Sequence, residues 1–236
     1  MKQTIFFIVT VLVLTSCTTT GNLNSESSSY DTTEPPITQS LFNDKNSSIS
    51  EENIQKILDG NYELPKKWRI AIVKVESKQY QRYYWTNEEY LKTQQSYLDL
   101  FTEKFKNFQQ VTSVSVIPDL LISNNPTFVN IRESAVRTQA NIVAIYSITS
   151  DIYSRYRAFS PDIIKAFATV EFIIMDVRTG LIPFSTIVKK DYRSQKEKTD
   201  LDYLEARNRV KNEAVLLAIN EIGQQLTNFL KTDNKQ

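Results

Sequence analysis

The side chains available for catalysis in this chain are few. The 236 residues include no histidine, one cysteine and four glycines. Without histidine there can be no Ser-His-Asp triad, no Cys-His pair and no zinc site with histidine ligands. Phosphate-binding loops need two or three glycines close together before one helix, and here no two glycines are close. Walker-type and Rossmann-type nucleotide sites are therefore excluded, and carboxylates, lysines, tyrosines and hydroxyls remain.

Two carboxylates are the best candidates for acid–base chemistry. Glu171 lies among apolar residues, where burial would raise the pKa of its carboxyl group. The alternative for Glu171 is an exposed position or an ion pair with Lys165 or Lys189. Asp176 precedes a tight turn and is most simply a turn-forming side chain. We therefore expect a protein that is not an enzyme and needs no cofactor and no metal. A hydrolase that uses carboxylates alone is the remaining catalytic alternative.

The cysteine, Cys17, follows a short apolar segment at the start of the chain. Met1-Lys2-Gln3 supplies a positive charge, an apolar run extends from Thr4 to Leu14, and small residues precede Cys17. These three features are typical of a secretory signal peptide. The apolar run is shorter than the ~20 residues that a membrane-spanning helix needs. An ordinary signal peptide or a short membrane helix with an incidental cysteine is the alternative.

The four residues that end in Cys17 resemble the lipobox of bacterial lipoprotein signals. The stretch is Leu14-Thr15-Ser16-Cys17. The resemblance implies that residues 1–16 are a signal peptide and that the thiol of Cys17 carries a lipid, including palmitate, that anchors the chain in the cell envelope. Thr18 is not the aspartate that marks inner-membrane retention in enteric bacteria. We therefore expect a location at the outer membrane facing the periplasm, with a Gram-positive outer leaflet still open.

Composition indicates an ordinary folded protein after a polar tether. The formal net charge is +1, from 28 Lys and Arg against 27 Asp and Glu, so the basic excess typical of nucleic-acid binding is missing and no nucleic-acid partner is expected. Residues 17–50 are rich in Ser, Thr and Asn and contain Pro35-Pro36, which predicts a disordered tether. Residues 51–236 are expected to form the folded domain.

Hydrophobic periodicity places helices and strands along that domain. Apolar residues on both parities predict covered strands at 68–75 and 141–148, and alternation predicts a half-exposed strand at 111–117. A turn at Arg178-Thr179-Gly180 joins two strands as a hairpin. The order β-α-β-α-β, then a hairpin and a long helix, predicts one α/β domain with a single mixed sheet and helices packed on it. The remaining expected elements are helices at 51–58, 87–108, 130–140 and 201–230 and strands at 166–177 and 182–191.

Three strand-like stretches resemble a group of bacterial envelope lipoproteins. They are Trp68 to Val73, Ala140 to Ser147, and Glu171 to Gly180 with its Asp-x-x-Thr-Gly turn. The pattern is similar to the domain shared by the curli-secretion lipoprotein, the lipoprotein activators of penicillin-binding proteins and the N-terminal domain of TolB, and to the lipoproteins named rhombotarget. The resemblance covers roughly Leu64 to Leu230. It implies a non-catalytic domain that acts by contact with another envelope protein.

Two clusters of aromatic and basic residues are candidate partner-binding sites, because Tyr, Trp and Arg are enriched at binding hot spots. The alternative for the first cluster is packing over the core, and for the second a solvated edge strand whose charges discourage pairing. A third, basic stretch at 189–198 contains interleaved acids and is expected to be a solvated loop. The first cluster is Tyr80, Arg82, Tyr83, Tyr84 and Trp85, and the second is Tyr153, Arg155, Tyr156, Arg157 and Phe159.

The expected function is therefore that of a membrane-anchored interaction or assembly module. Its partners would be the membrane, through the lipid on Cys17, and another envelope protein. A structural subunit that self-associates into a homo-oligomer is the alternative of a different class.

Overall fold

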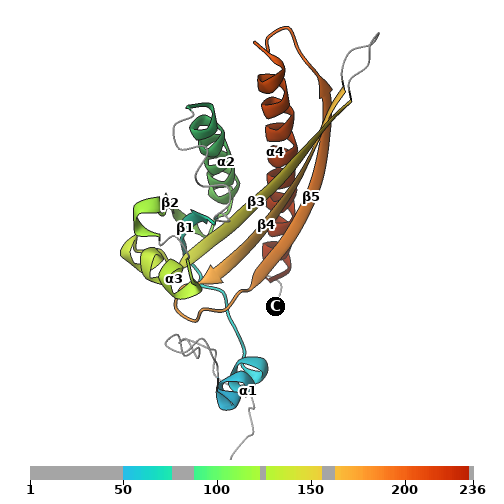
Figure 1. Ribbon diagram of the computed structural model, residues 1–236. Coiled ribbons are helices and arrows are strands. Elements are labelled where there is room, and N and C mark those ends of the chain that lie inside the picture. The colour runs from blue at the N-terminus through green and yellow to red at the C-terminus, as the bar shows by residue number, and fades with distance from the viewer. Residues whose placement is uncertain (1–49, 76–87, 123–125, 156–162, 234–236) are drawn as a thin grey trace, which may run out of the picture. The chain divides into compact units, whose positions relative to one another are not determined.

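The structure is a computed structural model that describes residues 50–75, 88–122, 126–155 and 163–233 (Figure 1). The side chains of residues 154, 155 and 233 are outside this description. All the described residues belong to one unit of the chain, which spans residues 34–236.

The strands form one five-stranded mixed sheet in the order β2-β1-β3-β4-β5, as the α/β prediction requires. β1 (Trp68–Lys74) lies parallel to β2 (Val111–Val116) on one side and to β3 (Ile142–Arg155) on the other. β4 (Ile163–Asp176) and β5 (Phe184–Gln195) continue from β3 as an antiparallel meander. The parallel pairs come from the early alternation of strands and helices, and the antiparallel pairs from the later hairpins.

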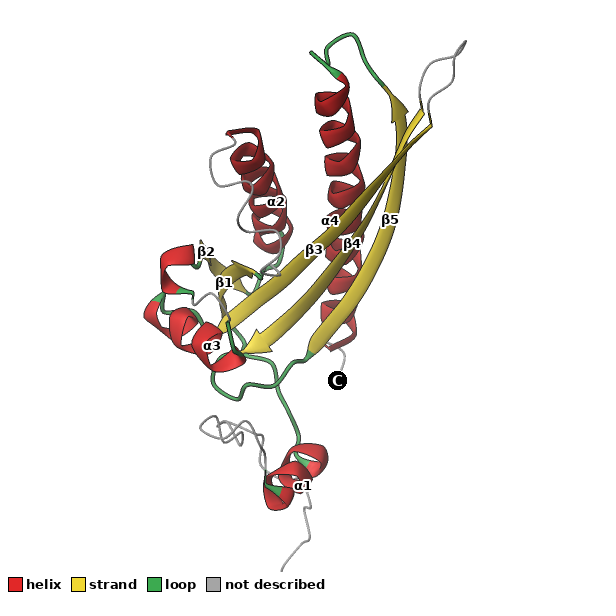
Figure 2. Ribbon diagram, in the orientation of Figure 1, coloured by secondary structure: helices red, strands yellow, loops and turns green. Residues whose placement is uncertain are grey.

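Helices cover the two faces of this sheet unequally (Figure 2). α2 (Glu88–Lys106) and α4 (Tyr203–Asp233) pack on one face and on each other, and α3 (Phe128–Arg137) packs on the opposite face at one end of the strands. α1 (Glu51–Asp59) has no buried residue, and η1 (Asp119–Leu121) is a single 3-10 turn. Among the described helices, none has the length and apolar character that a membrane crossing requires.

The larger core lies between the sheet and the pair α2 and α4. The side chains of β4 alternate, so that its even-numbered residues from Ile164 to Ile174 are buried against the helices. An aromatic stack fills the centre: the rings of Phe101 and Phe172 are 5.4 Å apart, and Tyr146 lies 4.8 Å from Phe101. On α4, buried residues run from Ala206 to Leu230.

Local side-chain bonds fix the ends of several elements. The Oγ of Ser50 accepts the N–H of Asn53, so Ser50 is the N-cap of α1. The carboxylate of Asp176 accepts the N–H of Arg178 at 2.7 Å, and Gly180 takes a positive φ of 77° that suits glycine. Asp176 is therefore the turn-forming side chain that the sequence predicts, and it is buried.

An ion-pair cluster joins the end of β5 to α4. Arg209 donates from Nε and Nη2 to the two carboxylate oxygens of Asp200, at 2.9 and 2.8 Å. The same guanidinium contacts Glu197 at 2.8 Å and the carbonyl of Gln195 at 2.9 Å. The hydrogen bonds from Arg209 lower the pKa of the Asp200 carboxyl group to about 2, against an opposing effect of burial.

Several predicted boundaries are wrong, and the reason is strand pairing. The predicted strand at 141–148 continues without a break to Arg155, because β4 pairs with it along its whole length. The basic residues from Lys189 to Arg193 lie in β5, so their stretch is a strand rather than a loop. On α2, Leu91 is 56% exposed, and Tyr97 lies in the core. On β2, Val116 is 44% exposed.

Candidate functional site

Most of the residues selected from the sequence lie outside the described part of the chain. Cys17 and the first aromatic cluster, Tyr80, Arg82, Tyr83, Tyr84 and Trp85, fall there, as do Tyr156, Arg157 and Phe159 of the second. Arg155 is described only as the last residue of β3. These assignments stay predictions.

Tyr153 is the one member of the two clusters whose side chain is described. It is 60% exposed and meets the ring of Phe167 edge-on at 5.5 Å. The Nζ of Lys165 lies 4.5 Å above the Phe167 ring and forms a 3.0 Å ion pair with Asp191. These side chains share the face of the meander that α2 and α4 leave uncovered, so Tyr153 belongs to a small solvated patch on a strand.

The two carboxylates considered for catalysis do not form a catalytic pair. Glu171 is exposed, and Ser147 donates to it at 3.5 Å, so it is not the buried carboxyl group that the sequence allows. Asp176 is occupied by its turn and by the hydroxyl of Tyr62, which donates to Oδ2 at 3.1 Å. Within the described residues, no three histidine, cysteine or acidic side chains cluster as metal ligands would.

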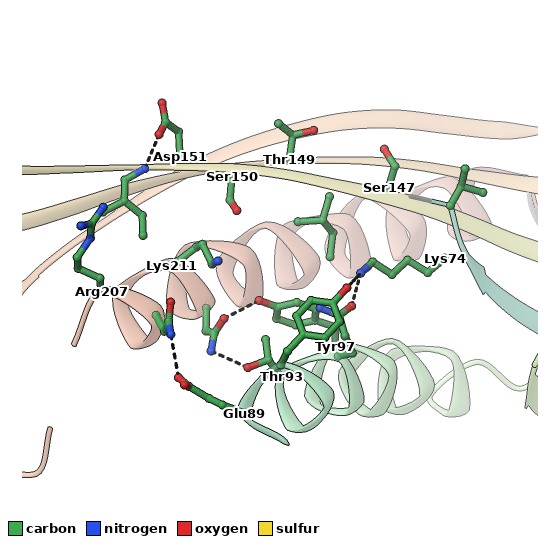
Figure 3. Close-up of a pocket in the computed structure, with 17 residues that line it drawn as sticks. Lys74, Glu89, Thr93, Tyr97, Ser147, Thr149, Ser150, Asp151, Arg207 and Lys211 are labelled. Carbon is green, nitrogen blue, oxygen red and sulfur yellow. Dashed lines mark hydrogen bonds between the residues drawn. The ribbon is translucent and has the colours of Figure 1, made fainter. Parts of the chain in front are cut away.

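A pocket that the sequence does not predict lies between α2, α4 and the distal half of β3 (Figure 3). Its volume is about 370 Å³. The end of β1 contributes Lys74, and α2 contributes a polar face that includes Tyr90, Gln94 and Tyr97. The first turns of α4 contribute Arg207, Asn208, Lys211 and Asn212, and β3 contributes residues 147–152.

Hydrogen bonds between the two helices build the floor of this pocket. The hydroxyl of Tyr97 donates to Oδ1 of Asn212 at 2.8 Å, and Nδ2 of Asn212 donates to the hydroxyl of Thr93 at 3.0 Å. Burial raises the pKa of the Tyr97 hydroxyl, which keeps it a donor at every physiological pH. At the rim, Nδ2 of Asn208 donates to Glu89 at 3.2 Å. The polar groups of the floor are therefore held in place, and their hydrogen bonds are already made within the protein.

The walls of the pocket carry an excess of positive charge. Lys74 donates to Tyr90 at 3.2 Å and to Gln94, which hold its ammonium group beside the cavity. Burial lowers the pKa of Lys211; Glu89 acts in the opposite sense, and the neighbouring Arg207 and Lys74 reinforce the lowering. The buried Nε of Arg207 has no hydrogen-bond acceptor among the described residues. The cations of Lys74, Arg207 and Lys211 thus face a small space. Those of Arg207 and Lys211 are incompletely compensated by acceptors and opposite charges among the described residues.

β3 supplies the pocket with a strand edge. β1 pairs with β3 only as far as Lys74 and Tyr146, whereas β4 pairs with β3 up to Arg155. Beyond Tyr146, the side of β3 that faces the pocket has no strand partner in the described part of the chain. Figure 3 shows the side chain of Ser150 directed toward the helices and those of Thr149 and Asp151 directed away.

Sequence reasoning missed this site because each part of it has an ordinary appearance. Arg207, Asn208, Lys211 and Asn212 repeat at steps of one, three and one, which is typical of a solvated helix face. The only signal was the polar stripe itself, on a helix whose other face is apolar from Ala206 to Leu230.

No protein-family model and no curated protein matches the chain. Among solved structures, a Helicobacter pylori protein described as a homologue of the neuraminyllactose-binding hemagglutinin is 16% identical over 73% of this chain and 93% of its own, with a TM-score of 0.41. A Neisseria meningitidis lipoprotein is 11% identical over 68% and 98%, with a TM-score of 0.33. A minor lipoprotein of Acinetobacter baumannii is 13% identical over 73% and 96%, with a TM-score of 0.29.

Two of these three neighbours are bacterial lipoproteins by description. At such identities and TM-scores they establish neither a shared family nor a shared function. None of the three is described as a curli-secretion lipoprotein, an activator of penicillin-binding proteins or TolB. The resemblance to those families therefore stays a prediction.

Proposed function

We propose that this chain is a lipid-anchored lipoprotein of the bacterial cell envelope whose folded domain binds another envelope protein and catalyses no reaction. The anchor is Cys17, and the expected location is the outer membrane facing the periplasm. The observation that carries the binding role is the pocket, which combines a strand edge that no described strand covers with cations that are incompletely compensated. Several of its polar groups are held in place by hydrogen bonds, as Tyr97 and Asn212 are.

The anchor is tested by metabolic labelling. Cells that express the full chain are grown with radiolabelled palmitate, and the Cys17→Ser variant is the control. We expect label in the wild-type band and none in the variant, since the thiol is the acylated group. A wild-type band without label would refute the anchor, and label that persists in the variant would refute the attachment site.

The binding role is tested by photocrosslinking from the rim of the pocket in intact cells. A photoreactive phenylalanine replaces Glu89, which is exposed at the rim, or Glu103, which is exposed on the same helix about 21 Å away. We expect the Glu89 position alone to give a discrete adduct, in which mass spectrometry identifies a second envelope protein.

Two outcomes would contradict that expectation. Identical adducts from the two positions would remove the pocket as the binding site. An adduct with the mass of two copies of this chain would instead support the alternative of a self-associating structural subunit.

A further inference from the structure

The starting point is the mismatch in length between β1 and β3. β3 has 14 residues and β1 has 7, and only five register pairs join them. On its other side β3 is paired with β4 at every position from Ile142 to Arg155. In the described part of the chain, Ser147 and the residues after it therefore have a strand neighbour on one side only. Such a row of open backbone groups is a template for a further strand.

The backbone groups that face the pocket can be assigned from the hydrogen bonds of the paired part. The N–H of Val75 donates to the carbonyl of Tyr146 at 2.8 Å, so the backbone groups of Tyr146 point to the side of β1. Because the direction alternates along a strand, the N–H and C=O groups of Ile148, Ser150 and Ile152 point to that same side. They line the pocket, and no strand among the described residues pairs with them.

One hydrogen bond agrees with an edge that no strand among the described residues covers. The N–H of Ile152 donates to Oδ1 of the adjacent Asp151 at 2.8 Å. In a paired strand an N–H of this orientation would donate to a neighbouring backbone carbonyl. The side chain of Asp151 thus substitutes for a missing partner at one end of the edge, whereas Ile148 and Ser150 have no such substitute in the described residues.

The wall opposite this edge selects the charge of an occupant. Arg207 and Lys211 are one helical turn apart on α4 and both line the pocket. The buried Nε of Arg207 lacks an acceptor among the described residues, and burial works against the charge of Lys211. Glu89 is the acidic side chain at the rim, and Asp151 is turned toward Ile152. A carboxylate in the pocket would supply an acceptor for Arg207 and a counter-charge for Lys211.

We propose that the pocket binds an extended acidic segment of another envelope protein, which adds as a strand along Ile148 to Ile152 and directs a carboxylate side chain to Arg207 and Lys211. This inference rests on the proposed function and specifies its mode of binding. Main-chain hydrogen bonds to the edge provide affinity, and the cations provide specificity, as in other cases of strand addition. Since side chains alternate along a strand, the acidic residues of the segment recur at every second position on the face toward the helices.

A small free anion would explain the cations but not the edge. It could neutralise Arg207 and Lys211, and it would leave the backbone groups of Ile148 and Ser150 without partners. An extended peptide satisfies both features at once, which is why we favour it. The experiment separates the two occupants.

The probe is a library of acetylated and amidated eight-residue peptides with Glu fixed at the fourth and sixth positions and the other positions randomised. A twin library carries Gln at the two fixed positions. Both are presented to the full-length protein in detergent micelles. We expect enrichment from the Glu library only. For the peptide selected, the double variant Arg207→Gln with Lys211→Gln should weaken binding at least tenfold. The matched double variant Lys189→Gln with Arg193→Gln, on the exposed face of β5, should leave binding unchanged.

Backbone methylation tests the strand geometry directly. N-methylation of the amides of one parity in the selected peptide should abolish binding, and methylation of the other parity should not, because only alternate amides face the edge. Equal effects of the two parities would overturn strand addition. Binding of glutarate as tight as that of the peptide would assign the pocket to a small anion instead.

Failure of this inference is distinguishable from failure of the proposed function. If no peptide is enriched while the Glu89 position still gives a crosslink to another envelope protein, the domain binds a partner but not through an added acidic strand. If the peptide binds as described and the crosslink is missing, the mode of binding stands and the cellular role does not.

Discussion

The edge of β3 that no described strand covers predicts where proline is tolerated in this strand. Proline removes a backbone N–H, which is harmless only where that N–H has no partner. Ser150 and Thr149 are neighbours in the same strand, and their backbone groups point to opposite sides. Ser150→Pro removes a donor that faces the pocket. Thr149→Pro removes a donor that faces β4, where Thr149 lies opposite Thr169.

The magnitudes follow from what each N–H does. At Thr149 the change loses a ladder hydrogen bond, worth about 1 kcal/mol net, and leaves an acceptor in β4 without its donor, which costs roughly 1–3 kcal/mol more. The free energy of unfolding should therefore fall by roughly 2–4 kcal/mol. At Ser150 neither loss occurs, so the free energy of unfolding should fall by less than in the Thr149 variant.

The assay is urea unfolding of the two purified variants and the wild type, followed by far-ultraviolet circular dichroism at one pH. The slope of the transition should be the same for all three proteins, so that midpoints compare directly. If Ser150→Pro is as destabilising as Thr149→Pro, its N–H is already bonded within the chain, the edge is closed, and the argument for strand addition fails. If the reasoning holds, Ser150→Pro is folded and has lost its affinity for the acidic peptide.

Two further predictions concern stability. Phe172→Ala should lower the free energy of unfolding by about 3–5 kcal/mol, because its ring is fully buried between helices and sheet, and urea unfolding measures the loss. Asp200→Asn should lower the urea midpoint at pH 7, because the Asp200 carboxylate is stabilised in the folded state. Since the pKa of this group is about 2 when folded and about 3.9 when unfolded, the difference from wild type should shrink as the pH falls from 4 to 2.

Each of these has a matched control. Phe167→Ala removes the same ring from the exposed face of the same strand, where it is 41% exposed, and should cost less than about 1.5 kcal/mol. An equal loss from the two positions would contradict the assignment of the core to the α2 and α4 side. For Asp200, a difference from wild type that stays constant between pH 4 and pH 2 would mean that the asparagine variant acts by some other route than charge.

The order of elements was predictable because local signals agree with the fold. Ser50 and Gly60 mark the ends of α1, and apolar residues on both parities of β1 indicate a central strand. The motifs that carry the resemblance to bacterial envelope lipoproteins have structural roles. Asn141 accepts the N–H of Arg69 at 2.7 Å and so joins β3 to β1, and Asp176 builds a turn. Motifs of this kind identify a fold more readily than a function.

The extension of β3 and the pocket could not be predicted from the sequence, and the reason is the same for both. Residues Thr149 to Asp151 have the composition of a turn, and they are strand residues because β4 lies beside them. The pocket in turn exists because β3 continues where β1 ends. Arg207 and Lys211 line the pocket together with a strand more than fifty residues away in sequence. No short stretch of the sequence contains both β3 and these two residues, so a local pattern cannot reveal that they lie together.

The bond between Asp151 and Ile152 bears on how the molecule avoids its own copies. A bare row of backbone groups invites aggregation, and proteins commonly guard such rows with charge. Two identical molecules that met along this row would bring aspartate near aspartate and set the guanidinium and ammonium groups of one against those of the other. Self-association along this edge is thus disfavoured by like-charge repulsion. A partner segment of opposite charge meets no such repulsion.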